Sequence, residues 1–270
     1  MSEHLAINKP FADLIESNKK IAFPARDIST ESRFTGKLRY IWGWIVVSTI
    51  LLIVAPILII FYRFKKKRDG FFAWCDWGAK LWIKSCGADV VVRGREHLQA
   101  DESYVFISNH RSYLDTATLY AYAGKRLGLV AKKELLKIPI FGYGMGIANV
   151  IAIDRQNPTK ARESMQKARK VMDQGYSFGV FAEGGRAYPN ELLPFKKGAF
   201  HLALQTGAPI VPVAIKNTDW MMGKKRGVAY PGTIEMVLLP PIETKDLTVD
   251  KDLMGLLKKV RALVAEELAK

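Results

Sequence analysis

From residue 88 onward, short apolar runs alternate with longer amphipathic stretches. The short runs predict strands at 89–93, 104–108, 128–131, 150–153, 177–181, 210–214 and 233–238. The longer stretches predict helices at 113–124, 139–147, 158–174, 197–206 and 250–268. Strands that alternate with helices indicate an α/β fold with a largely parallel sheet flanked by helices.

A different pattern precedes this region. Residues 40–62 contain no charged side chain and carry aromatic residues at both ends. A helix over this run would be ~34 Å long, enough to cross a ~30 Å hydrocarbon layer. The length and the aromatic ends disfavour a buried core helix and predict an N-terminal membrane-inserted helical segment. Pro56 leaves two forms open, a spanning helix or a re-entrant hairpin in one leaflet.

Two flanking stretches complete the membrane prediction. Residues 63–68, Arg-Phe-Lys-Lys-Lys-Arg, form a basic cluster that is denser than the Lys37 and Arg39 pair on the other side. Cytoplasmic loops carry an excess of Lys and Arg, so we expect the following domain on the cytoplasmic side of the membrane, against anionic phospholipid headgroups. Residues 71–87 combine large aromatic residues with Lys80 and Lys84, which is typical of an interfacial amphipathic helix.

These patterns predict three parts. Residues 1–39 form a polar N-terminal arm with a short helix around 11–21 and otherwise little order. Residues 40–87 form a membrane-associated segment, and residues 88–270 form the α/β domain. The arm is not expected to be a signal peptide, because the apolar run comes late and no small-residue cleavage site follows it.

The amino-acid composition narrows the classes of binding partner that we expect. The chain has 41 Lys and Arg against 26 Asp and Glu, a formal net charge of +15. Such an excess favours anionic partners: nucleic acid, a phospholipid surface or a phosphorylated substrate. The two cysteines, Cys75 and Cys86, fit no zinc pattern, and we expect no metal site.

The stretch 109–115, Asn-His-Arg-Ser-Tyr-Leu-Asp, carries the first candidate chemistry. It follows the predicted strand 104–108, and Ser112 has the features of a helix N-cap with Asp115 three residues later. A histidine in the turn before the helix can fold back over Asp115. A carboxylate that holds His110 would make it a general base. The alternative is a capped helix with a surface histidine.

The stretch 183–186, Glu-Gly-Gly-Arg, follows the predicted strand 177–181. Gly184 and Gly185 let the backbone approach an anion, and Arg186 can bind a phosphate with two parallel hydrogen bonds. Glu183 is expected to orient the loop rather than to perform catalysis. Ligands of α/β sheets lie beyond the carboxyl ends of strands, so His110 and Arg186 should border one cleft. The alternative is a plain surface turn.

One further motif competes with this interpretation. Residues 175–179 fit the G-x-S-x-G pattern of serine hydrolases. That motif needs a strand before its serine and a helix after it. Here a helix is predicted before Ser177, and the predicted strand begins at Ser177. The order is the reverse of that in a hydrolase, so a hydrolase is not expected.

Four blocks in order resemble the glycerolipid acyltransferase family, which includes the lysophosphatidic acid acyltransferases. His110 and Asp115 match its H-x-x-x-x-D motif. The other blocks are Lys132-Lys133-Glu134-Leu135 with Ile153-Asp154-Arg155, then 181–186 with 193–200, and finally 209–213. The resemblance covers roughly residues 70–240. It implies that His110 and Asp115 are catalytic, and that Arg186 binds phosphate with help from Lys132 or Lys133. Gly185 replaces the family's usual threonine.

The resemblance implies a membrane-bound O-acyltransferase. It would move a fatty acyl group from acyl-CoA or acyl carrier protein to the free hydroxyl of a lysophospholipid, with 1-acyl-glycerol 3-phosphate, which gives phosphatidic acid, as the favoured acceptor. No bound cofactor and no nucleic-acid partner are implied. Another lysolipid acceptor, a basic membrane-tethered nucleic-acid-binding protein and a scaffold of the same fold are the alternatives. The sequence leaves open the donor, the chain length and the oligomeric state.

Overall fold

The computed structural model describes residues 9–28, 30–62, 69–131, 141–152 and 158–270. Its main feature is a seven-stranded sheet with the strand order β2-β9-β8-β3-β6-β4-β5. All neighbouring strands are parallel except β8 and β9, which confirms the largely parallel sheet predicted from the sequence. The strands are β2 (Ala88–Arg93), β3 (Val105–Ser108), β4 (Leu127–Ala131), β5 (Ile151–Ala152), β6 (Ser177–Phe181), β8 (Ile210–Lys216) and β9 (Gly232–Leu238).

Strand β3 lies at the centre of the sheet. All four of its residues are buried, and it pairs with β6 on one side and β8 on the other. Val105 and Ile107 belong to one apolar core and Phe106 to the other. A strand covered on both faces needs an apolar side chain at every position, which is why its sequence shows a continuous run rather than an alternation.

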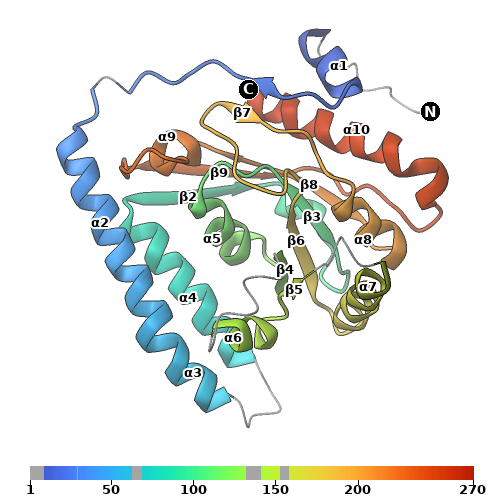
Figure 1. Cartoon of the computed structure of the whole chain (residues 1–270), viewed down its shortest axis with the longest axis horizontal. Helices are drawn as coiled ribbons and strands as arrows, with labels where there is room; N and C mark the ends of the chain where they lie inside the picture. Colours follow the sequence, from blue (N-terminus) through green and yellow to red (C-terminus); the bar gives the residue numbers. More distant parts are fainter. Residues whose placement is uncertain (1–8, 29, 63–68, 132–140, 153–157) are drawn as a thin grey trace.

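Helices cover both faces of the sheet (Figure 1). The core that contains Phe106 also includes residues of α4 (Asp69–Ser85), α5 (Tyr113–Tyr122) and the short α9 (Thr218–Met222). The other core includes residues of α7 (Pro158–Met172), α8 (Gly198–Thr206) and α10 (Val249–Ala269). The remaining helices of the domain are α6 (Phe141–Ile147) and a 3-10 turn, η2 (Arg95–His97). The start of the predicted helix 139–147 and the last residue of the predicted strand 150–153 lie outside the described residues.

The N-terminal arm packs against the domain. Helix α1 (Lys9–Glu16) is followed by β1 (Ile21–Ala22), which pairs antiparallel with β7 (Glu191–Leu192). Ile15 and Ile21 are buried in the core shared with α10, and the buried Arg261 of α10 donates hydrogen bonds to the backbone carbonyls of Leu14 and Lys19. The prediction of little order beyond a short helix was therefore wrong. The few apolar residues of this polar stretch suffice to anchor it.

The apolar segment is a continuous helical run of 30 residues from Arg33 to Tyr62. It consists of α2 (Arg33–Thr49), a π-helical turn η1 (Ile50–Val54) and α3 (Ala55–Tyr62). The run begins earlier than the charge-free stretch 40–62, because Ser32 caps it by accepting a hydrogen bond from the Thr35 amide. The chain does not reverse at Pro56. The π-helical turn ends two residues before Pro56, and local π adjustments of this kind re-satisfy backbone groups that a proline leaves without a partner.

By length and composition this run could cross a membrane. Its 18-residue apolar stretch has a mean hydropathy of 2.9, and only 11% of that stretch is buried. Figure 1 shows α2 and α4 lying side by side along one side of the domain. Their close approach depends on small residues, since a Cβ at Gly43 would collide with the Cys86 Sγ atom. The large apolar residues that remain exposed on this run include Ile41, Ile45, Leu52 and Ile57.

Candidate active site

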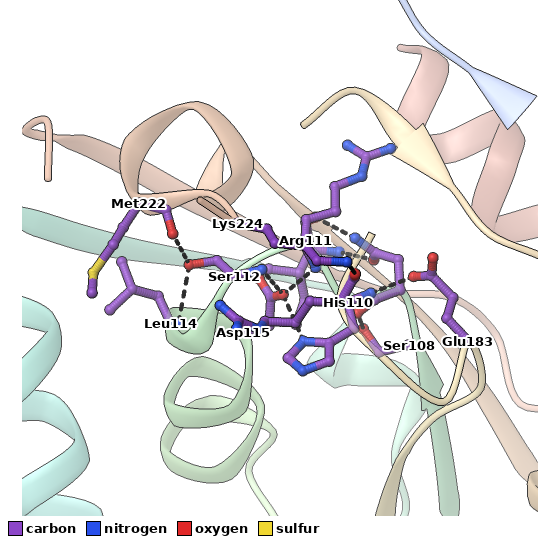
Figure 2. A network of polar contacts seen from close by, with 12 residues as sticks. Ser108, His110, Arg111, Ser112, Leu114, Asp115, Glu183, Met222 and Lys224 are labelled. Carbon is purple, nitrogen blue, oxygen red and sulfur yellow. Dashed lines mark hydrogen bonds and ion pairs between the residues drawn. The ribbon is translucent and has the colours of Figure 1, made fainter. Parts of the chain in front are cut away.

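The turn between β3 and α5 brings His110 and Asp115 together. Asp115 is fully buried, and its Oδ2 atom accepts three hydrogen bonds (Figure 2): from His110 Nδ1 at 3.0 Å, from the Arg111 amide at 2.6 Å and from the Ser112 amide at 2.7 Å. Ser112 caps α5 and forms a capping box with Asp115. The predicted contact between histidine and carboxylate is present.

This contact selects the form of the imidazole. An ionised carboxylate only accepts hydrogen bonds, so the ring must carry its proton on Nδ1 and leave the Nε2 lone pair available. The ring stacks on Phe181 with centroids 4.1 Å apart and planes at 22°. The histidine side chain is 15% exposed, which leaves it in reach of a substrate while its orientation is fixed.

Glu183, just after the neighbouring strand β6, holds the turn that carries His110. Its Oε1 accepts a hydrogen bond from the His110 amide at 2.5 Å, and its Oε2 accepts one from the Leu193 amide at 2.7 Å. The side chain therefore ties two loops together, as expected for a loop-orienting residue. Burial raises the pKa of the Glu183 carboxyl to about 8, although the two amide donors and Arg111 favour the ionised form.

Arg186 lies beside the same turn. The Ala187 amide donates to the His110 carbonyl at 2.7 Å, so the turns that carry His110 and Arg186 are in direct contact. The guanidinium carbon of Arg186 lies 3.5 Å from the ring centroid of Tyr113, the first residue of α5. Tyr113 in turn makes an edge-to-face contact with Trp44 of α2, with centroids 5.4 Å apart. Two aromatic side chains, Trp44 and Tyr113, thus connect the apolar helix to the guanidinium of Arg186.

The two glycines before Arg186 differ in their roles. Gly184 has a positive φ of 70°, and a side chain there would meet Lys196. A Cβ at Gly185 would meet nothing within 4 Å, so the position has space for the threonine that this chain lacks. Lys132 and Lys133 lie outside the described residues. Ser177 is buried, and its Oγ accepts a hydrogen bond from the Tyr104 amide, which gives it a structural contact.

Several site residues were not predicted. Asn109 forms a pair of hydrogen bonds with the backbone of Ile215 in β8, at 2.9 and 2.8 Å. Arg111 forms a buried ion pair with Asp219 at 3.1 Å and also donates to the Glu191 carbonyl at 2.7 Å. These partners are about a hundred residues apart in sequence, so no local pattern could have indicated them. Within the described ranges, no group of three or more His, Cys, Asp and Glu side chains could hold a metal ion.

Comparison with known proteins places this site in a family. Residues 89–216 match the family model described as Acyltransferase. The chain is 40% identical over 168 residues to the 1-acyl-sn-glycerol-3-phosphate acyltransferase of Saccharomyces cerevisiae, a match over 61% of this chain and 55% of that protein. It is 37% identical over 177 residues to the mouse 1-acyl-sn-glycerol-3-phosphate acyltransferase alpha, a match over 65% of this chain and 62% of that protein.

A solved structure shares the fold. The crystal structure of the 1-acyl-sn-glycerophosphate acyltransferase from Thermotoga maritima superposes with a TM-score of 0.72, at 22% identity, over 87% of this chain and 97% of that one. Residues 89–216 therefore form a domain of the family described as Acyltransferase, and the chain shares the fold of the solved structure. Within that family it is similar to the 1-acyl-sn-glycerol-3-phosphate acyltransferases, and it spans 55–62% of the length of the two curated relatives above.

The raised pKa of Glu183 predicts a pH dependence of stability. The folded state binds the proton of Glu183 more tightly than the unfolded chain does, so the free energy of unfolding should fall as pH rises from about 4.5 to about 8. The slope from this one group is at most about 1.4 kcal/mol per pH unit. Denaturant unfolding of the wild type and of Glu183→Gln across this range should give stability curves that differ by this slope, steeper in the wild type.

The exposed Glu243→Gln variant controls for the loss of a carboxylate as such. Parallel curves for the wild type and Glu183→Gln would contradict a neutral Glu183 at the start of this range.

Proposed function

We propose that the protein transfers a fatty acyl group from a thioester donor, acyl-CoA or acyl carrier protein, to the free hydroxyl of 1-acyl-glycerol 3-phosphate. The observation that carries the proposal is the contact between two turns: one holds His110 by Asp115, and the other presents Arg186. A base and a phosphate-binding cation side by side suit an acceptor that carries both a hydroxyl and a phosphate. The names of the related proteins support the same acceptor.

The residues define a direct transfer. His110 Nε2 accepts the proton of the acceptor hydroxyl while the hydroxyl oxygen attacks the thioester carbonyl carbon. The new C–O bond forms, the C–S bond breaks, and the leaving thiolate takes the proton back from the imidazolium. Asp115 stabilises the imidazolium and keeps the ring in its productive tautomer. No covalent enzyme intermediate is required.

The space at Gly185 bears on the acceptor. A threonine hydroxyl at this position would add a polar contact beside Arg186, and glycine removes both the contact and the bulk. Other lysophospholipids therefore remain acceptors to compare with 1-acyl-glycerol 3-phosphate. Purified protein, a panel of lysolipids and each donor, with mass analysis of the products, would identify the acceptor and the donor together.

We also propose that the helical run Arg33–Tyr62 and α4 attach the protein to a membrane, with the α/β domain on the cytoplasmic side. Three features support this: the length of the run, its exposed apolar side chains, and the adjacent basic residues 63–68. Membrane phospholipids are then partners of this surface. The same features argue against nucleic acid as the anionic partner, because the positive charge is concentrated where lipid headgroups would lie.

Removing the base should abolish turnover. We expect His110→Ala to lower kcat by ~10³ or more with little change in fold, because the reaction depends on proton removal by a positioned group. Asp115→Asn should cause a somewhat smaller loss, since its amide favours the wrong tautomer of His110. Thioester-release assays measure both, with the exposed His97→Ala as the control. Retention of more than a tenth of the activity in His110→Ala would exclude this mechanism.

Removing the guanidinium should affect one substrate only. We expect Arg186→Ala to raise the KM for the phosphorylated acceptor at least tenfold, because a bidentate charged contact contributes ~1.5–3 kcal/mol. The KM for the donor should change little, and Arg186→Lys should recover part of the loss. If donor affinity falls and acceptor affinity stays, Arg186 belongs to the donor side of the site.

The basic cluster should control lipid selectivity. Replacement of Lys65, Lys66, Lys67 and Arg68 by glutamine should weaken binding to anionic vesicles more than to neutral ones, by ~1 kcal/mol per charge. A control variant removes the same charge at exposed positions elsewhere, in Lys167, Arg169, Lys170 and Lys251. Vesicle sedimentation measures the binding. An equal effect of both variants would refute a specific electrostatic role for residues 65–68.

A further inference from the structure

A segment outside the four sequence blocks also forms part of the site. Residues 222–224 begin at the last residue of α9 and lie beyond the matched residues 89–216. Gly223 forms an antiparallel bridge with Ser112, the Ser112 Oγ donates to the Met222 carbonyl at 2.7 Å, and the Lys224 amide donates to the Arg111 carbonyl at 3.2 Å (Figure 2). The segment is therefore fixed along the catalytic turn itself.

Only a small residue allows this approach. A Cβ at Gly223 would collide with the carbonyl of Asp219 one turn earlier. Asp219 is itself held by the buried ion pair with Arg111. The position of the next residue, Lys224, is thus determined by the same contacts that hold the catalytic turn.

The side chain of Lys224 reaches the second turn of the site. Its Nζ donates to the Arg186 carbonyl at 2.6 Å and lies 4.4 Å from the ring centroid of Tyr188. An ammonium group has three donors, and the bond to Arg186 uses one of them. In the part of the chain that the structure describes, neither Lys224 nor Arg186 forms an ion pair with a carboxylate. The ammonium group of Lys224 therefore lies against the turn that carries Arg186, and that turn is in contact with the His110 turn.

The charge of the proposed acceptor gives a reason for more than one cationic side chain at the phosphate. A phosphate monoester carries between one and two negative charges near pH 7, so one arginine leaves it incompletely neutralised. Arginine suits the planar, bidentate part of the contact, and lysine adds a point charge.

We propose that Lys224 is a further phosphate-binding residue of the acceptor site, in addition to Arg186 and to the lysine, Lys132 or Lys133, that the resemblance implies, and that it contacts the phosphate that Arg186 binds. This inference rests on the proposed function.

The matched test compares neighbouring lysines. Lys225 is exposed and lies 5.8 Å from the same Tyr188 ring, farther than Lys224. Steady-state kinetics should be measured for Lys224→Met, Lys224→Arg and Lys225→Met, with 1-acyl-glycerol 3-phosphate and the donor varied separately. We expect Lys224→Met to raise the acceptor KM roughly tenfold and to leave the donor KM within about twofold. Lys224→Arg should recover most of the loss, and Lys225→Met should match the wild type.

A second measurement needs no turnover. Calorimetric binding of 1-acyl-glycerol 3-phosphate in detergent micelles should weaken in Lys224→Met by a factor similar to that in KM. An acceptor KM and affinity equal to the wild type would overturn the inference. So would a loss of kcat and of thermal stability that Lys224→Arg fails to restore, since that result indicates a purely structural lysine.

Arg186→Ala, measured in parallel, separates the two proposals. If Arg186→Ala loses acceptor affinity and Lys224→Met does not, only the role of Lys224 fails. If neither variant changes acceptor affinity, Arg186 does not bind the acceptor phosphate as the proposed function states, and the role of Lys224 fails with it.

Discussion

The site depends on one buried oxygen, Oδ2 of Asp115. It accepts hydrogen bonds from the His110 ring and from two consecutive backbone amides, and these three contacts set the course of the chain between β3 and α5. A buried carboxylate is costly unless donors surround it, so the turn and the charge stabilise each other. The imidazole is oriented by the same bonds that begin the helix. The contacts that orient His110 are therefore the same contacts that fold this turn.

The contacts around this turn come from distant parts of the chain. Asn109 forms hydrogen bonds with the backbone of β8, and Arg111 forms an ion pair with Asp219, which follows β8. Glu183, which follows β6, accepts a hydrogen bond from the His110 amide. The turn after the central strand β3 is thus held by contacts from the two strands that pair with β3, β6 and β8, and from the loops that follow them. A buried ion pair such as Arg111–Asp219 is weak evidence for stability, but loss of one partner leaves an uncompensated charge. We interpret the pair as a means of fixing the relative position of these loops.

The sequence predicted what short-range physics determines. Apolar runs identified every strand of the main sheet, since central parallel strands are apolar throughout, and the contact of His110 with Asp115 spans only five residues. The rule that ligands lie at strand ends brought His110 and Arg186 together correctly. The sequence could not indicate Asp219 or Lys224, whose partners are 108 and 38 residues away. The packed arm was missed for a related reason, because its anchors Ile15 and Ile21 are two apolar residues in a polar stretch.

The contacts from Trp44 through Tyr113 to Arg186 fix the distance between the apolar helix and the guanidinium. Two aromatic rings, each in direct contact with the next group, set the separation between the axis of the apolar helix and the guanidinium. In the proposed membrane-bound state, the depth to which this helix inserts would determine the height of the guanidinium above the acyl chains. A lipid whose phosphate lies at another level would have to leave its equilibrium depth to be bound. Membrane thickness and headgroup position would then influence which lipids are bound, before the reacting hydroxyl makes any contact.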